Sequence, residues 1–291
     1  MWQYPGSVDA RMQRRAKFIM GGIAVLAIMA LGRYGLIDSQ RSSAWAGLSS
    51  SRGTAPERPV MLAAATTDDG AAVRSWLRDQ VAGQNVLMPG PGFDLLAELD
   101  EDTRDRGRIR LLPSGRSVPK VQGDEGERWL DGRLWPAGRG LGGEQSAAYL
   151  DLHNIRAVEA DFETRRGERD FGDAPGGAHG GDTDPGDVLV PGEAVKGDIA
   201  RALFYMSLRY DGRGGEAPLQ LVARPAAVGE SAVGGLCTLL AWNERDPVDS
   251  GERRRNDRVE RYQGNRNPFV DRPEFARVVW GRQCPGRGPS S

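Results

Sequence analysis

Residues 151–172 read DLHNIRAVEADFETRRGERDFG, and this stretch decides the fold that we expect. We predict a strand at its start, on which His153 shares a face with Asp151 and Ile155, followed by a helix. Glu159 and Glu163 are four residues apart, which places them on one face of such a helix. Four further blocks accompany this stretch: RWLDGRLWPAGRG (128–140), KGDIARALFYMSLRY (196–210), LAWNERDPVD (240–249) and RYQGNRNPFVD (261–271).

Taken in this order, the blocks resemble the endonuclease I family of secreted bacterial nucleases, over roughly residues 108–280. The resemblance implies an α+β fold with a ββα-metal finger core, in which several helices surround a small β hairpin or sheet. It also implies a metal-dependent, sequence-non-specific endonuclease that hydrolyses the phosphodiester bonds of DNA or RNA. In such a site a His takes a proton from water, and a divalent ion held by Glu and Asn stabilises the developing charge.

The chain departs from the family at the positions that carry this chemistry. Family members typically read Trp-Asn-Arg-Glu-His-x-Trp-Pro where this chain reads WLDGRLWP at 129–136. Gly132 therefore stands at the position of the metal-binding Glu, Arg133 at the position of the His, and Glu163 at the position of the Asn. Gly132 has no side chain to bind a metal, and Arg133 offers only donors and cannot act as a base.

The charges at positions 133 and 163 are expected to have opposite effects on the binding of a metal ion. A fixed Arg133 cation repels each unit of positive charge on an ion about 4 Å away by about 4 kcal/mol. Glu163 replaces a neutral amide with an anion, which either holds a metal ion better or forms an ion pair with Arg133.

Other residues of the stretch offer substitutes for the missing groups. His153 is a candidate base, or else an unreactive structural histidine. Glu159 and Glu163 either share an ion or are solvated acids on a helix surface. Four arginines either bind phosphate near the helix start or only balance the neighbouring acids: Arg156, Arg165, Arg166 and Arg169.

Three functional hypotheses follow. The first is a nuclease with impaired activity, which requires Mg²⁺ or another divalent cation and no small-molecule cofactor. The second is a catalytically dead relative that binds nucleic acid or acts as a scaffold, and the third moves the base to His153. The formal net charge of −1 excludes binding to nucleic acid through overall charge, so DNA or RNA must bind a local basic surface through its phosphate backbone.

The first 46 residues have the order of an export signal. Basic residues precede the charge-free run FIMGGIAVLAIMALG at 18–32, which at about 1.5 Å per residue falls short of the roughly 30 Å hydrocarbon core. A cleaved signal peptide and a periplasmic or extracellular location are therefore expected, with AWA at 44–46 as the cleavage site. An uncleaved signal anchor that tethers the protein to the membrane is the alternative.

The rest of the chain divides by composition. We expect a flexible linker at 47–60, an endonuclease I-like domain at 61–285 and a disordered tail at 286–291. Apolar spacing predicts helices that bury residues 73–81 and 93–99, and a hairpin is expected around the turn at 113–115. Residues 172–192 are expected to form a long loop without regular structure. Cys237 and Cys284, the two cysteines of the chain, either form one disulfide or leave a buried thiol.

Further helices are predicted towards the C-terminus. One begins near Asp198, whose carboxylate is expected to cap it, and the next covers residues 236–244. A helix over residues 253–262 is expected to stop at Gly264, and Pro273 is expected to open a last short helix. The polar residues around these helices are assigned mainly to scaffolding and helix capping. A basic rim at 253–255 is the weaker, functional alternative.

Overall fold

The computed structural model describes residues 70–87, 90, 92–121, 128–173 and 188–285. The expected signal segment at 1–46, the linker at 47–60 and the tail at 286–291 lie outside these residues. Within the described ranges, no helix combines the length and apolarity needed to cross a membrane.

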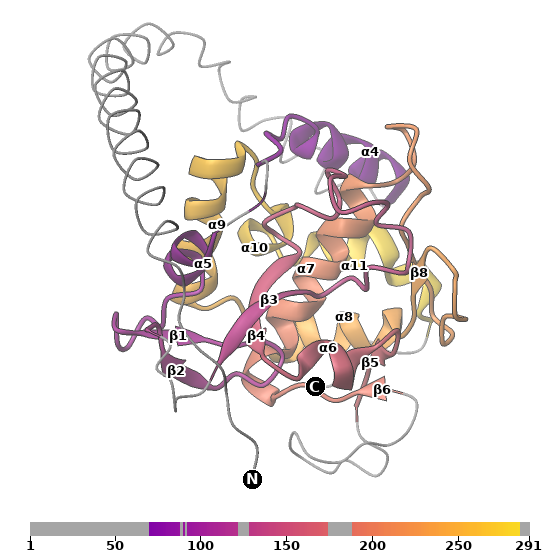
Figure 1. Ribbon diagram of the computed structural model, residues 1–291. Helices are drawn as coiled ribbons and strands as arrows, with labels where there is room; N and C mark the ends of the chain where they lie inside the picture. The colour runs from indigo at the N-terminus through magenta and orange to yellow at the C-terminus, as the bar shows by residue number, and fades with distance from the viewer. Residues whose placement is uncertain (1–69, 88–89, 91, 122–127, 174–187, 286–291) are drawn as a thin grey trace, which may run out of the picture. The chain divides into compact units, whose positions relative to one another are not determined.

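The described part of the chain is α+β, as the sequence predicts. Figure 1 shows helix α7 in the middle, with the β3–β4 pair on one side and α8 and α11 on the other. The longer helices are α4 (Gly70–Val81), α7 (Lys196–Arg209), α8 (Leu236–Arg245) and α9 (Ser250–Gln263). The shorter ones are α5 (Phe93–Leu99), α6 (Phe162–Arg166), α10 (Pro268–Asp271) and α11 (Phe275–Trp280), with 3₁₀ turns η2 (Glu193–Val195) and η3 (Gly281–Gln283).

The strands found in the described ranges form four separate two-stranded sheets. Antiparallel pairs join β1 (Arg108–Arg110) to β2 (Ser117–Pro119) and β3 (Trp129–Arg133) to β4 (Ile155–Glu159). Parallel pairs join β5 (Asp170–Phe171) to β6 (Val188–Leu189) and β7 (Gln220–Leu221) to β8 (Ala232–Val233). The hairpin expected at 113–115 is confirmed. Most of the loop expected at 172–192 lies outside the described residues, which omit 174–187, and the prediction is wrong at its end, because Val188 and Leu189 pair with β5.

Helix α7 forms the centre of the largest hydrophobic core. Every one of its residues except Asp198 and Arg209 is buried, because α4, α8 and α10 all pack against it. The carboxylate of Asp198 does not cap this helix. Instead Asp246, which follows α8, accepts a hydrogen bond from the backbone N–H of Gly197 at 2.8 Å. The helix start is thus fixed by a residue far along the chain.

The C-terminal helices begin and end at residues suited to those places. The carboxylate of Asp249 accepts from the N–H of Glu252 at the start of α9, and Gly264 ends that helix with φ of 89°. Asn267 caps α10 by accepting from the N–H of Phe269 at 3.0 Å. The expected end of this helix at Gly264 and the assignment of Asn267 to helix capping are therefore confirmed.

The two cysteines form a disulfide. Cys237 lies in α8 and Cys284 follows η3, with their Cα atoms 5.5 Å apart. The bond closes a segment of 47 residues that contains α9, α10 and α11. It therefore ties the C-terminal helices to α8.

Candidate functional site

The candidate site lies where β3, β4 and α6 meet. In the antiparallel register of the two strands, Gly132 lies opposite Arg156 and Arg133 opposite Ile155. Helix α6 begins at Phe162, three residues after β4 ends. The end of β3 is held in place because Asn154 accepts from the backbone N–H of Trp135 through its side chain at 2.7 Å.

Gly132 is buried between two apolar side chains. A Cβ atom added to Gly132 would lie 2.7 Å from both Cγ atoms of Val158 and 2.9 Å from the Cδ1 atom of Phe162. These distances are shorter than van der Waals contact, so a larger residue at this position requires Val158 or Phe162 to move. The space that a side chain on residue 132 would enter is thus already filled by core packing.

Arg133 is held by three interactions. Its Nε donates to the carbonyl of Tyr149 at 3.2 Å, and its guanidinium lies over the ring of the same tyrosine at 3.8 Å. A second nitrogen lies 3.2 Å from the carboxylate of Asp131. The Arg133 side chain is only 12% exposed, so these contacts position it as a fixed donor and cation.

Glu159 and Glu163 do not share a helical face. Glu159 is the last residue of β4, whereas Glu163 lies in α6, so the i,i+4 arrangement that we expected is wrong. The carboxylate of Glu159 lies 3.7 Å from a guanidinium nitrogen of Arg165, which also pairs with Asp161 at 3.0 Å. The side chain of Glu163, and with it the expected pairing to Arg133, lies outside the described part of the chain.

Two of the four candidate phosphate-binding arginines are buried. Arg166 is 1% exposed, donates to the carbonyl of Leu134 at 3.1 Å and lies over the ring of Phe171 at 4.0 Å. It therefore ties the end of α6 to the residue after β3. Arg156 is 7% exposed and donates to Asp100 at 2.8 Å. Arg165 and Arg169 remain partly exposed.

Asp100, at the end of α5, is a buried residue that sequence reasoning missed. Its carboxylate accepts from Nε of Arg156 at 2.8 Å, from Nε of Arg255 at 2.7 Å and from the backbone N–H of Ala157 at 2.8 Å. Burial alone would raise the pKa of Asp100, but the two guanidinium groups outweigh it and lower that pKa. Arg255 belongs to this cluster, so the residues at 253–255 do not form one exposed basic rim.

His153 lies in the turn before β4, not on the strand that we expected. Its ring packs against Tyr205 with centroids 4.2 Å apart, and it is 4% exposed. The Nε2 atom donates to the backbone carbonyl of Asn265 at 3.3 Å, which requires a proton on Nε2. Burial, opposed by nearby Asp151, lowers the pKa of His153 to about 4. The imidazole is thus neutral at physiological pH and is shielded from solvent.

The titration of His153 gives a direct check of this environment. The unfolded chain binds a proton on this residue below about pH 6.5, while the folded chain does not until about pH 4. Stability from this group is therefore fully present above pH 6.5 and is lost as the pH falls, by about 3 kcal/mol over the window. NMR titration of the imidazole C–H resonances should show one histidine that stays neutral to about pH 4.

The same spectrum contains its own control, because His179 is the only other histidine of the sequence. Total stability also depends on Glu252, because burial and nearby Asp198 raise the pKa of its carboxyl to about 7. The contribution of Glu252 is present at low pH and is lost as the pH rises, which is opposite to that of His153. The resonance of His153 is therefore a cleaner measure than total stability. A midpoint of both histidines near pH 6.5 would contradict the buried position of His153.

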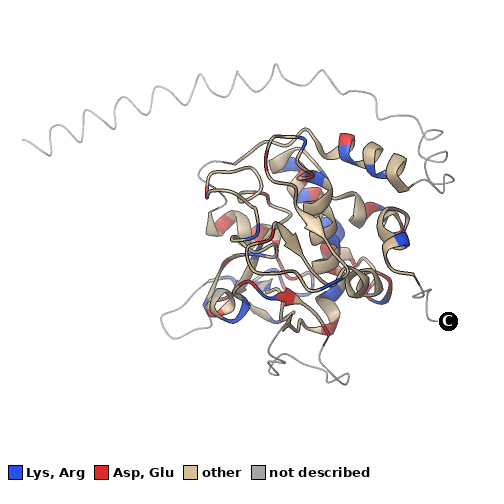
Figure 2. Cartoon of the chain, turned by 90° about the vertical axis from the view of Figure 1, so that its right-hand side faces the viewer, with Lys and Arg blue, Asp and Glu red and all other residues tan. Residues whose placement is uncertain are grey.

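The charges around the candidate site are mixed in sign. Figure 2 shows Lys and Arg interspersed with Asp and Glu along the elements in view. Near the site the exposed acids Asp131 and Asp161 lie beside Arg133 and Arg165, and each makes an ion pair with its neighbour. Such pairs reduce the positive field that Arg133 and Arg165 present to a polyanion.

Comparisons with known proteins agree on one family. A family model described as Endonuclease I matches residues 133–274. The extracellular ribonuclease of Bacillus amyloliquefaciens is 35% identical over 226 residues, which cover 74% of this chain and 76% of that protein. The extracellular ribonuclease of Bacillus subtilis (strain 168) is 34% identical over 220 residues, 72% of this chain and 75% of that protein. An extracellular deoxyribonuclease of Aeromonas hydrophila is 31% identical over 129 residues, 42% of this chain and 49% of that protein.

Proposed function

The chain belongs to the endonuclease I family, and from this premise we propose that it is an exported nuclease-type protein whose phosphodiester hydrolysis is impaired. The observation that carries the proposal is the packing around Gly132. Gly132 has no side chain that could bind a metal ion. A larger side chain would also find no room at this position, because Val158 and Phe162 fill the space.

We assign the ββα-metal finger to β3, β4 and α6. They occur in that order, the two strands pair antiparallel, and Arg166 links the end of α6 to Leu134 just beyond β3. This arrangement supports placing residues 132, 133 and 163 around one site.

The residues at these positions do not fit the divalent ion that the family resemblance implies. Gly132 supplies no donor atom, and Arg133 places a fixed cation on the adjacent residue. Among the residues whose side chains are described, no three His, Cys, Asp or Glu lie close enough to hold an ion together. These residues therefore do not support a metal-assisted step at this place.

Neither Arg133 nor His153 is suited to act as the base. Arg133 carries only hydrogen-bond donors, and it already donates to Tyr149 and Asp131. His153 is neutral, as a base must be, but its ring is enclosed by Tyr205 and its Nε2 proton is directed to Asn265. A base has to reach the proton that it removes, so a structural role fits His153 better.

Binding of nucleic acid is the activity that such a protein can retain. Arg165 and Arg169 are the candidate phosphate ligands that remain partly exposed next to α6. Relatives named ribonuclease cover most of this chain, so RNA is the first substrate to test and DNA the second. A scaffold without nucleic-acid binding is the competing function.

Export is proposed on three grounds. The basic and apolar order of residues 1–46 suits a signal segment, with a domain at 61–285 after the linker at 47–60. The relatives are named extracellular proteins. The disulfide between Cys237 and Cys284 is typical of an oxidising compartment.

Cleavage assays on the full-length chain test the proposal. With RNA or supercoiled plasmid and Mg²⁺, we expect cleavage at least about 100-fold slower than by the Bacillus amyloliquefaciens ribonuclease, because a missing base alone costs about 10²- to 10⁴-fold. Cleavage at a comparable rate that EDTA abolishes would contradict the proposal. In that event, loss of the activity in His153→Ala would favour a relocated base.

A further inference from the structure

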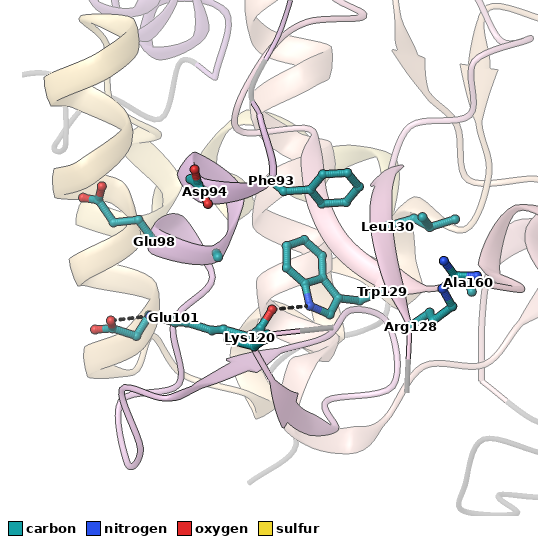
Figure 3. Close-up of a pocket in the computed structure, with 11 residues that line it drawn as sticks. Phe93, Asp94, Glu98, Glu101, Lys120, Arg128, Trp129, Leu130 and Ala160 are labelled. Carbon is teal, nitrogen blue, oxygen red and sulfur yellow. Dashed lines mark hydrogen bonds and ion pairs between the residues drawn. The ribbon is translucent and has the colours of Figure 1, made fainter. Parts of the chain in front are cut away.

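A cavity of about 920 Å³ lies beside the candidate site, between α5 and the start of β3. Figure 3 shows Phe93 of α5 and Trp129 and Leu130 of β3 around it, with Arg128 and Ala160 at the same end as Leu130. Neither the missing catalytic groups nor the buried ion pairs account for this cavity.

An aromatic side chain is held exposed in this cavity. Phe93 is 55% exposed although it is apolar, and its ring meets Trp129 edge to face with centroids 5.3 Å apart. Trp129 is itself buried, and its Nε1 donates to the carbonyl of Lys120 at 3.3 Å. Phe93 therefore packs on a side chain that is held in place, while more than half of the residue stays exposed to a ligand. A flat aromatic surface of this kind suits stacking of a nucleobase.

The charges of the cavity are divided between its two ends. Arg128 is exposed and makes no ion pair with a residue that the structure describes. At the other end lie Asp94, Glu98 and Glu101, of which Glu101 pairs with Lys120 at 2.7 Å and Glu98 lies 3.7 Å from Arg261. Asp94 is the exposed acid at this end, so a phosphate group is attracted to the Arg128 end rather than to the Asp94 end. This polarity fixes the direction in which a nucleotide can enter.

The cavity is continuous with the proposed ββα motif. Leu130 precedes Gly132 by two residues on β3, and Ala160 lies between β4 and α6. A phosphate bound at the Arg128 end would therefore lie beside the elements that carry residues 132, 133 and 163. A base that is paired in a duplex cannot stack on a protein side chain, so the ligand must be unpaired.

We propose that this cavity is a nucleotide subsite, in which one unpaired base stacks on Phe93 while its phosphate lies at Arg128. The inference rests on the proposed function and adds to it a preference for single-stranded over double-stranded nucleic acid. Residues 132 and 133 do not line this subsite.

Binding of labelled oligonucleotides to the full-length chain tests this subsite. Fluorescence anisotropy in EDTA at fixed low salt should give tighter binding of a short single-stranded oligoribonucleotide than of the matching duplex. Phe93→Ala should weaken single-strand binding by about 5- to 100-fold, and Phe93→Tyr should retain it. Arg128→Ala should lower the slope of log affinity against log salt by about one.

Val228→Ala is the matched control, because Val228 is an apolar side chain that is 85% exposed and does not line the cavity. Circular dichroism checks that each variant is folded. Equal binding by the chain with Phe93 and by Phe93→Ala would overturn the subsite and leave the proposed function intact. No binding to either oligonucleotide by the unaltered chain would overturn both.

Discussion

A chain with Gly132→Glu, Arg133→His and Glu163→Asn is expected to gain metal-dependent cleavage only when Val158→Ala is added. The first three changes supply the base and the metal ligands that the family resemblance implies. Without the fourth, the new side chain at position 132 would start 2.7 Å from the Cγ atoms of Val158, and the strand pair would have to distort. Val158→Ala removes both atoms and leaves only the ring edge of Phe162 to shift.

Nicking of supercoiled plasmid with Mg²⁺ measures the effect. The fourfold variant should cleave about 10²- to 10⁴-fold faster than the unaltered chain, because the base and the ligands act as a unit and no single change supplies both. Val158→Ala by itself is the control for packing, and it should cost roughly 2 kcal/mol of stability without creating activity. A folded threefold variant that cleaves as fast as the fourfold one would show that the space at residue 132 is not limiting.

Replacing Asp100 by Ala should destabilise the fold by about 3–5 kcal/mol. The carboxylate is fully buried and accepts from Arg156, Arg255 and the backbone of Ala157, so its loss leaves two buried guanidinium groups without their anion. Urea unfolding of the unaltered chain and the variant measures the difference. Because Arg156 belongs to β4, the strand pair of the candidate site should also loosen.

Asp94→Ala is the matched control, because Asp94 is an exposed acid in α5, the short helix that Asp100 caps at its C-terminal end. This change should alter stability by no more than about 1 kcal/mol. A loss below about 1 kcal/mol for Asp100→Ala would mean that the two arginines find other partners or reach solvent.

The elements that could be predicted from the sequence are those with local signals. Apolar spacing identified α4 and α5, and Gly264 marked the end of α9. The start of α7 was predicted to within two residues, near Asp198, but its capping group was not, because Asp246 lies 49 residues further along the chain than Gly197. Helix α10 was missed, although Asn267 followed by Pro268 is a sequence pattern for a helix start.

The candidate site was only partly predictable for a similar reason. The identity of Gly132 revealed the lost ligand, but the contacts with Val158 and Phe162 depend on the pairing of β3 with β4 and the position of α6. An arginine can face solvent, or it can be buried where an acid pairs with it, and the acid that pairs with Arg156 is 56 residues away. Sequence spacing alone therefore could not separate buried arginines from phosphate ligands.

The disulfide between Cys237 and Cys284 makes the stability of the protein depend on the redox environment. By closing 47 residues it restricts the unfolded chain, an entropic effect of about 4 kcal/mol in the loop-closure description. Where thiols are kept reduced, the same sequence would hold α9, α10 and α11 by packing and polar contacts alone. The segment from α9 to α11 therefore reaches its full stability only after the two thiols have been oxidised to the disulfide.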